Sequence, residues 1–312
     1  MINKSDKNWL TEHFGAHVLF NEPMWRHTTF RIGGPVDALI TVKTQQEIKD
    51  LAVWARDRGH PIMILGAGSN LLVRDGGVRG LVLKLADDFE AIHLSPRING
   101  SSAMITAGAA VLVRRLGKYA LDQRLAGLNF ALGIPGAVGG ALRMNAGAWG
   151  GCMADITCSI RVLNRYGDIS RMIRDQLRFS YRGLDLEKGT IILSGQFELR
   201  HGDREALQKE AIRMQQKRRL SQPLSLPSAG SVFRNPPGQK AAGKLIDQAG
   251  LKGLRVGEAE VSTKHANFIV NKGHARASDV LDLIRQIQET VLKRFGVNLD
   301  PEVTIVGQKA GS

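Results

Sequence analysis

Two glycine-rich segments carry the clearest chemical signal in this sequence. The first contains Gly66, Gly68, Ser69 and Asn70, and it directly follows the short apolar run 60–65. Small residues after a strand let backbone N–H groups converge on an anion, which is one way in which proteins hold phosphate groups. An isolated Gly-x-Gly-Ser-Asn is also a common turn, so the segment alone leaves both interpretations open.

The usual dinucleotide-binding fingerprint does not fit this loop. That fingerprint needs a third glycine and a helix that starts at the loop. Here Leu71 occupies the position of the third glycine, and residues 72–84 have the pattern of strand, turn and strand. A Rossmann domain is therefore not expected, whereas a phosphate cradle made of loop backbone stays open.

The second segment, residues 133–151, contains seven glycines in nineteen residues. Each glycine loses more conformational entropy on folding than any other residue, so such density needs a reason. Tight packing of small residues is one explanation, and close approach of the backbone to a flat or extended cofactor is the other. We favour the cofactor, although composition does not identify it.

Other polar residues are ambiguous when each is taken singly. Lys217 to Arg219 fall in the last turn of a helix expected over 203–219, with Asp203 as its cap. Cations there complement the helix dipole, but they could equally hold a diphosphate. Tyr181-Arg182, Ser231 and Glu302 have ordinary structural roles as their simplest explanation. His13 and His17 have i, i+4 spacing, but Gly15 lies between them and no third ligand is near in sequence. The two cysteines lack CxxC spacing, so no metal is expected.

Periodic patterns predict the elements that position these residues. Thr44 and Glu47 form a capping-box pattern, and Ile48, Leu51, Ala52 and Ala55 follow at helical spacing. Further helices are expected at 242–249 and 278–295, the latter with its apolar face formed by Val280, Leu283, Ile284, Ile287 and Val291. A strand is expected at 301–306. Residues 1–30 are expected to be an irregular lead-in, followed by domains at 31–202 and 203–312.

Composition limits the classes of function. The 312 residues carry 43 Lys and Arg against 29 Asp and Glu, a net charge of +14, and 43% are hydrophobic. This composition predicts a globular protein whose partners are anionic, such as nucleic acids, membrane surfaces or phosphorylated small molecules. No secretory signal or membrane span is expected from the sequence, and Cys152 and Cys158 are expected to stay reduced in the cytoplasm.

Taken together, these segments resemble the UDP-N-acetylenolpyruvoylglucosamine reductase family over roughly residues 20–308. No single motif is specific, but their order is. The motifs are Thr29-Phe-Arg-Ile-Gly33-Gly34, Leu65-Gly-Ala-Gly-Ser-Asn70, Gly133-Ile-Pro-Gly136 through Met144-Asn-Ala-Gly147, Ser180-Tyr-Arg182, Ala229-Gly-Ser-Val-Phe233, Gly243-Lys-Leu-Ile246, His265-Ala-Asn-Phe268 and Pro301-Glu-Val303.

The resemblance implies an α+β fold. It consists of a two-part FAD-binding domain of the vanillyl-alcohol-oxidase (PCMH) type and a C-terminal α+β substrate-binding domain. The chain is similar to the branch of the family that lacks an extra tyrosine-bearing loop. The family usually continues its tyrosine motif as Tyr-Arg-x-Ser, whereas Leu184 stands at the serine position here.

The resemblance also implies roles for individual residues. Arg182 corresponds to the catalytic arginine, Ser231 to the proton donor and Glu302 to the catalytic acid. Tyr181, Arg218 and Asn235 match positions near the UDP-sugar. Noncovalent FAD is expected to contact the two glycine segments and one upstream arginine, namely Arg31, Gly66, Gly68, Ser69, Asn70, Gly133, Pro135, Gly136, Gly139, Gly140, Asn145 and Gly147.

The implied reaction reduces UDP-N-acetylglucosamine enolpyruvate to UDP-N-acetylmuramate, with NADPH as reductant, for peptidoglycan synthesis. The expected enzyme is a cytoplasmic monomer without nucleic-acid or membrane partners. Two other functions fit parts of the sequence. A flavin oxidase of the same fold would often tether FAD through a histidine in residues 66–70, where there is none. A nucleic-acid binder would need basic and aromatic stacking residues, and only 5% of residues are aromatic.

Overall fold

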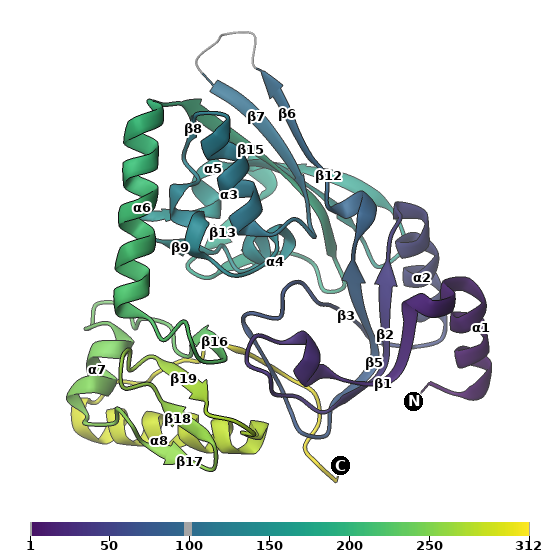
Figure 1. Ribbon diagram of the computed structural model, residues 1–312. Helices are drawn as coiled ribbons and strands as arrows, with labels where there is room; N and C mark the ends of the chain where they lie inside the picture. Colours follow the sequence, from purple (N-terminus) through teal and green to yellow (C-terminus); the bar gives the residue numbers. More distant parts are fainter. Residues whose placement is uncertain (1, 97–101, 312) are drawn as a thin grey trace. The chain divides into compact units, whose positions relative to one another are not determined.

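A computed structural model of the chain describes residues 2–96 and 102–311 (Figure 1). The helices are α1 (Lys4–Phe14), α2 (Gln45–Asp57), α3 (Val113–Asp122), α4 (Val138–Arg143), α5 (Met153–Ile156), α6 (Arg204–Ser221), α7 (Ala242–Gln248) and α8 (Ala277–Phe295). Short 3-10 segments are η1 (Gly15–His17), η2 (Met24–His27), η3 (Asp87–Phe89), η4 (Asn129–Gly133) and η5 (Arg174–Gln176).

Among the described residues the strands range in length from two residues to the eleven of β15. They are β1 (Val18–Pro23), β2 (Pro35–Val42), β3 (Ile62–Ile64), β4 (Leu71–Val73), β5 (Val78–Leu85), β6 (Ile92–Pro96), β7 (Ser102–Gly108), β8 (Leu125–Ala126), β9 (Gly147–Ala148), β10 (Gly151–Cys152), β11 (Thr157–Leu163), β12 (Ile169–Ile173), β13 (Arg178–Ser180), β14 (Gly183–Asp185), β15 (Ile191–His201), β16 (Ser228–Ser231), β17 (Arg255–Val256), β18 (Ala259–Val261), β19 (Phe268–Asn271) and β20 (Thr304–Val306).

The chain forms two compact units that interleave along the sequence. Unit 1 consists of Met1–Leu19, Ala38–Ala67 and Gly80–Lys217, and unit 2 consists of Phe20–Asp37, Gly68–Arg79 and Arg218–Ser312. The contiguous domain boundaries that the sequence suggested stay a prediction, because compact units and evolutionary domains need not coincide.

Helix α2 forms as its sequence predicts. Thr44 Oγ1 accepts a hydrogen bond from Glu47 N at 3.1 Å, and Glu47 Oε2 accepts one from Thr44 N at 3.3 Å. The predicted face of Ile48, Leu51, Ala52 and Ala55 is buried. These two bonds satisfy backbone donors that the first helical turn leaves without an intrahelical acceptor. The strand after it, β3, pairs in parallel with β5 within a sheet of order β1-β2-β5-β3.

The expectation of an irregular lead-in is wrong, because residues 4–14 form helix α1. Asn3 and Asp6 make a capping box, in which Asp6 N donates to Asn3 Oδ1 at 2.9 Å and Asn3 N donates to Asp6 Oδ2 at 3.0 Å. Leu10 and Phe14 are buried on the inner side of the helix. The helical periodicity of this segment is weak because it has few apolar residues. The Asn3–Asp6 capping box is the clearer indication of a helix.

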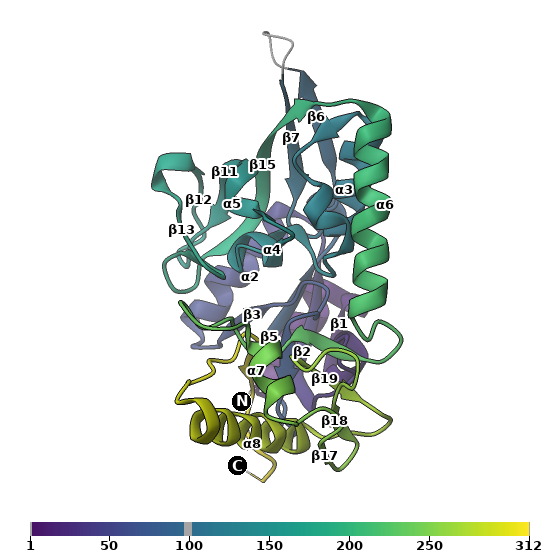
Figure 2. The same ribbon diagram turned by 90° about the vertical axis from the view of Figure 1, so that its left-hand side faces the viewer.

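The larger sheet of unit 1 has the order β12-β11-β15-β7-β6, with β8 pairing to β15. The pairs within it are antiparallel. Helices α4 and α5 pack against β15 (Figure 2). Contact there is close enough that a Cβ on Gly195 would lie 2.8 Å from Leu142 Cδ1. This core holds the second glycine-rich segment in place.

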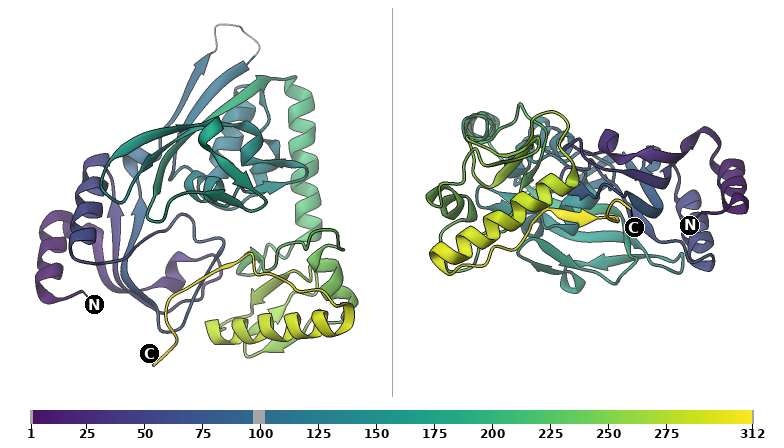
Figure 3. Two further views of the ribbon diagram at one scale, coloured as in Figure 1. Left: turned by 180° about the vertical axis from the view of Figure 1, so that it is seen from behind. Right: turned by 90° about the horizontal axis from the view of Figure 1, so that it is seen from below.

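Unit 2 contains a sheet of order β16-β19-β18-β17 and the helices α7 and α8. Helix α8, the long yellow helix of Figure 3, packs against β17 and β18. Its predicted apolar face is buried, and Gly296, with a φ of 68°, ends it in the left-handed conformation. The strand expected at 301–306 is confirmed over Thr304–Val306, where β20 pairs in parallel with β4.

Within residues 2–96 and 102–311, none of the helices has the length and apolar content that crossing a bilayer requires. In the same ranges, no three His, Cys, Asp or Glu side chains gather as a metal ion would require.

Candidate functional site

Unit 1 encloses a cavity of about 790 Å³. Its apolar walls come largely from β3 and the start of β15, including Ile62, Ile64 and Ile191. Basic side chains also line it, namely Arg56, Lys84, Arg143, Arg165 and Lys188, together with the carboxylate Glu90. An apolar cleft edged by cations suits a ligand that combines a flat ring with phosphate groups.

Three of the predicted cofactor-binding glycines line this cavity: Gly66, Gly139 and Gly140. A Cβ on Gly66 would lie 3.3 Å from Ala137 Cβ, and one on Gly139 would lie 3.0 Å from Ala109 Cβ. A Cβ on Gly140 would meet no described atom within 4 Å. Packing therefore accounts for Gly139, whereas Gly140 leaves open space that a cofactor can approach.

The remainder of the first glycine loop is anchored in unit 2. Gly68 has a φ of 62°, and a Cβ there would lie only 2.2 Å from the carbonyl oxygen of His27. Asn70 Nδ2 donates to Glu302 O at 3.1 Å, and Thr304 N donates to Asn70 O at 3.0 Å. These contacts fix the path of the loop, including Ser69 between them.

Two other predicted cofactor residues have distinctive backbones. Arg31 has a φ of 55°, and its N–H donates to Thr28 O at 3.1 Å in unit 2. Gly136 in unit 1 has a φ of 149°, a region in which only glycine is comfortable. Gly133 and Pro135 lie just before Gly136, at the end of η4 and in the loop that follows, and they are not among the walls of the cavity.

Asn145 connects the second glycine segment to the hairpin that carries Tyr181 and Arg182. It is 7% exposed, donates through Nδ2 to Ser180 O at 2.9 Å, and accepts at Oδ1 from Ala154 N at 3.0 Å. Gly147 is equally constrained, because a Cβ there would lie 2.7 Å from Cys152 Cβ. Both residues therefore support neighbouring backbone, whatever else they contact.

Tyr181 and Arg182 form the two-residue tip of the hairpin β13–β14. Arg182 has a φ of 59°, and its guanidinium lies 5.1 Å from the centre of the Tyr181 ring. Such a backbone conformation costs roughly 1–3 kcal/mol for a residue other than glycine, and strain of this kind concentrates at functional sites. Leu184, at the family's serine position, is buried opposite Phe179; Asn145 instead holds the hairpin.

Ser231 and Glu302 lie on adjacent stretches of backbone in unit 2. Ser231 ends β16 opposite Phe268 of β19. The next residue, Val232, accepts a hydrogen bond at its carbonyl oxygen from Glu302 N at 2.7 Å. One pairing therefore holds both residues in register.

Asn267 binds the backbone of the two residues that follow Ser231. It was not predicted as a site residue from the sequence. Its Oδ1 accepts from Phe233 N at 2.9 Å, its Nδ2 donates to Phe233 O at 2.8 Å, and its carbonyl accepts from Val232 N at 2.8 Å. Asn267 is 5% exposed. An amide inside the apolar run 266–270 was the available signal.

The two remaining substrate candidates differ. Asn235 Oδ1 accepts from Ala242 N at 3.0 Å, so this residue caps the start of α7. Arg218 is half-buried in α6, and burial lowers the pKa of its guanidinium. Among the described residues, no acceptor pairs with that guanidinium, which leaves a partly desolvated cation for an anionic ligand.

Comparison with known proteins finds two family matches in the chain. Residues 36–172 match the FAD binding domain family, and residues 222–306 match the C-terminal domain of UDP-N-acetylenolpyruvoylglucosamine reductase. The α+β class, with an FAD-binding domain and a C-terminal domain, is thereby confirmed.

Individual relatives match over nearly their whole length. The UDP-N-acetylenolpyruvoylglucosamine reductase of Desulfosudis oleivorans is 43% identical, over 98% of this chain and 100% of its own. That of Clostridioides difficile is 42% identical, over 93% and 94%. The crystal structure of the Thermus caldophilus reductase is 38% identical with a TM-score of 0.78, covering 93% of this chain and 98% of that one.

Proposed function

The chain belongs to the UDP-N-acetylenolpyruvoylglucosamine reductase family, and on that premise we propose that it reduces UDP-N-acetylglucosamine enolpyruvate to UDP-N-acetylmuramate with NADPH, using Ser231 as proton donor. It is an oxidoreductase whose cofactor is FAD. The observation that most supports the proposed roles is the 2.7 Å bond from Glu302 N to Val232 O, which keeps Ser231 and Glu302 in fixed register.

The residues present fit FAD. Gly140 leaves room beside a cavity that is lined by both apolar and basic side chains. We assign Gly66, Gly139 and Gly140 to the walls of this site. Gly68, Ser69, Asn70, Arg31, Gly133, Pro135, Gly136, Asn145 and Gly147 complete the proposed cofactor set. When bound there, FAD would supply two-electron hydride chemistry between NADPH and the methylene carbon of the enolpyruvyl group.

The chain's own residues then manage charge and protons. Hydride addition leaves negative charge on the carbon that bears the ether oxygen and on the adjoining carboxylate. Arg182 stabilises that charge as a fixed cation, and Glu302 donates a hydrogen bond to the same oxygens, either in its protonated form or through a water that it holds. Preorganised donors of this kind contribute about 3–4 kcal/mol each.

Ser231 completes the reduction by giving its hydroxyl proton to the carbon that bears the ether oxygen. The hydride and this proton together saturate the double bond and produce a lactyl ether. A serine hydroxyl is a weak acid, so it must regain a proton from solvent before the next turnover. Arg218, Tyr181 and Asn235 are proposed to contact the UDP-sugar, Arg218 through its unpaired cation.

We also propose that the protein works as a cytoplasmic monomer in the synthesis of peptidoglycan precursors. The net charge of +14 supports anionic small-molecule ligands, since FAD, NADPH and the UDP-sugar all carry phosphates.

The test is a two-step absorbance experiment without oxygen. NADPH should bleach the bands of bound oxidised flavin, and the enolpyruvyl substrate should restore them. A protein that purifies without flavin, or whose bleached flavin is not reoxidised by this substrate, would contradict the proposed function. Flavin that stays with the acid-precipitated protein would instead support a covalent flavin oxidase.

A further inference from the structure

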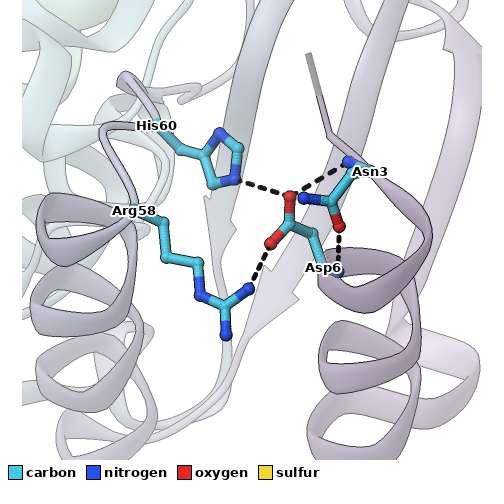
Figure 4. A network of polar contacts seen from close by, with 4 residues as sticks. All are labelled: Asn3, Asp6, Arg58 and His60. Atoms are coloured by element: carbon cyan, nitrogen blue, oxygen red, sulfur yellow. Dashed lines mark hydrogen bonds and ion pairs between the residues drawn. The ribbon is translucent and has the colours of Figure 1, made fainter.

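A buried carboxylate joins helix α1 to the end of α2 (Figure 4). Asp6 is 1% exposed and accepts three hydrogen bonds. Arg58 Nη1 lies 2.7 Å from Asp6 Oδ1, His60 Nε2 lies 3.0 Å from Oδ2, and Asn3 N also lies 3.0 Å from Oδ2. None of these residues has a part in the proposed reaction.

Stacked aromatic rings connect the same two helices. The Trp9 and Trp54 rings lie 4.4 Å apart with an interplanar angle of 8°, and the His13 ring, one helical turn after Trp9, stacks on Trp9 at 4.0 Å. Arg58 lies 5.5 Å from the Trp54 ring. The N-terminal helix is therefore docked by charge, hydrogen bonds and ring stacking together.

His60 belongs to both this network and the cavity. It lines the cavity together with Arg56 and Pro61, and its side chain is only 10% exposed. Burial alone would raise the pKa of Asp6, but hydrogen bonds from Asn3, Arg58 and His60 outweigh burial and lower that pKa. Asp6 is thus an ionised acceptor, so His60 donates to it through Nε2, and Nδ1 is the ring nitrogen left for another partner.

The position of the cavity indicates which end of FAD it would take. Gly66, Gly139 and Gly140 are in its walls, whereas Tyr181 and Arg182 of the same unit are not. Because the proposed function places Arg182 at the reacting atoms, the cavity suits the end of FAD away from the flavin ring.

Resting on that proposed function, we propose that His60 contacts the adenosine end of FAD and that Asp6 of helix α1 is a positioning residue that orients its ring. Helix α1 thereby contributes to the affinity of the protein for FAD. If Asp6 acted only on stability, its substitution would lower the melting temperature without changing the affinity for FAD. That difference can be measured.

The experiment measures dissociation constants of the apoprotein for FAD and, by competition, for ADP, which has the adenosine end alone. His60→Ala should raise both constants roughly five- to tenfold, the usual value of one hydrogen bond. Asp6→Asn should raise them in the same direction. The double variant should bind no more weakly than His60→Ala, because Asp6 acts through His60.

Two further variants keep the test decisive. His13→Ala removes a stacked imidazole of α1 that does not line the cavity, and it should leave both constants unchanged. His60→Gln retains an amide that can donate to Asp6 and should recover part of the affinity, which provides an answer even if Asp6→Asn does not fold.

Unchanged FAD binding by folded His60→Ala would overturn this proposal while leaving the proposed function intact, provided that the wild-type protein binds FAD and turns over. Weaker FAD binding with unchanged ADP binding would also overturn it, since the contact would then lie at the flavin end. A wild-type protein that binds neither ligand would overturn both proposals.

Discussion

At the scale of single residues, Gly140 distinguishes between the two explanations for a glycine, tight packing and close approach of a cofactor. Gly140→Ala should stabilise the apoprotein by up to about 1 kcal/mol, because alanine favours helix α4 and its Cβ meets open space. Gly140→Leu should fill that space and weaken FAD binding at least tenfold. Flavin fluorescence titration with apoprotein melting as control would measure both effects. Normal FAD affinity in the leucine variant would remove Gly140 from the cofactor site.

Gly68 is a poorer probe than its motif suggests. Any side chain there would collide with the backbone of His27 and Thr28 and would also have to adopt a positive φ. A loss of flavin in such a variant would therefore reflect local distortion as much as a blocked phosphate.

Arg218 should serve the sugar nucleotide. Its guanidinium is partly desolvated and unpaired among the described residues, so replacing it costs the fold no ion pair. Arg218→Ala should raise KM for the UDP-sugar about tenfold or more and leave the melting temperature within a few degrees of wild type, whereas an unchanged KM would assign Arg218 to the helix dipole. Arg204→Ala, at the other end of α6, is the matched control and should leave KM unaltered.

At this scale the sequence predicts site residues but not the residues that support them. Ser231 and Glu302 are predicted from recognisable motifs, and their roles stay predictions. Asn267 was not predicted as a site residue, although it lies in the motif His265-Ala-Asn-Phe268, because both of its side-chain hydrogen bonds reach Phe233, more than thirty positions away. The two explanations for residues 133–151 could be separated only in space, where Gly139 packs and Gly140 does not.

At the scale of elements, the β16–β19 pairing depends on Asn267. Asn267→Ala would leave the N–H and the carbonyl of Phe233 without their side-chain partners, at a cost of about 1–3 kcal/mol for each group that stays unsatisfied. The melting temperature should fall, and substrate-driven reoxidation of flavin should slow more than reduction by NADPH. The control is Asn164→Ala, which also removes two backbone contacts, but in an exposed turn of unit 1. Equal slowing of both steps would contradict this role.

Helix α1 should show a pH-dependent contribution to stability. The folded pKa of Asp6 is lowered below the unfolded value of about 3.9. Its stabilisation is therefore complete well above that value and is lost as pH falls through the folded pKa. Asp6→Asn should lower the melting temperature at pH 7, and the difference from wild type should shrink below pH 4. A constant difference from pH 7 to pH 3 would show that the charge of Asp6 is unimportant.

The elements differ in how readily the sequence predicts them. Helices α2 and α8 follow from caps and apolar periodicity, which are local properties. Helix α1 was missed because its inner face includes Asp6, a residue that is normally exposed. Its partners Arg58 and His60 lie more than fifty positions further along, so only the folded chain explains the burial.

At the scale of the whole molecule, the sequence did not predict that the chain would return twice to build unit 2. Residues 20–37 and 68–79 join the C-terminal third through contacts such as Thr29 Oγ1 to Ser228 O at 2.7 Å and β4 to β20. Pairing over more than two hundred positions has no signature in local composition. The charge of +14, in contrast, is a property of the whole sequence and indicates anionic partners, a class that includes phosphorylated small molecules such as FAD.

The central claim is that this protein runs two half-reactions and that Ser231 takes part in only one of them. Stopped-flow absorbance on Ser231→Ala tests it most directly. Reduction of bound flavin by NADPH should proceed at close to the wild-type rate, while reoxidation by the enolpyruvyl substrate should slow by roughly 10²- to 10⁴-fold, the usual contribution of a positioned proton donor. Reoxidation at the wild-type rate would contradict the account.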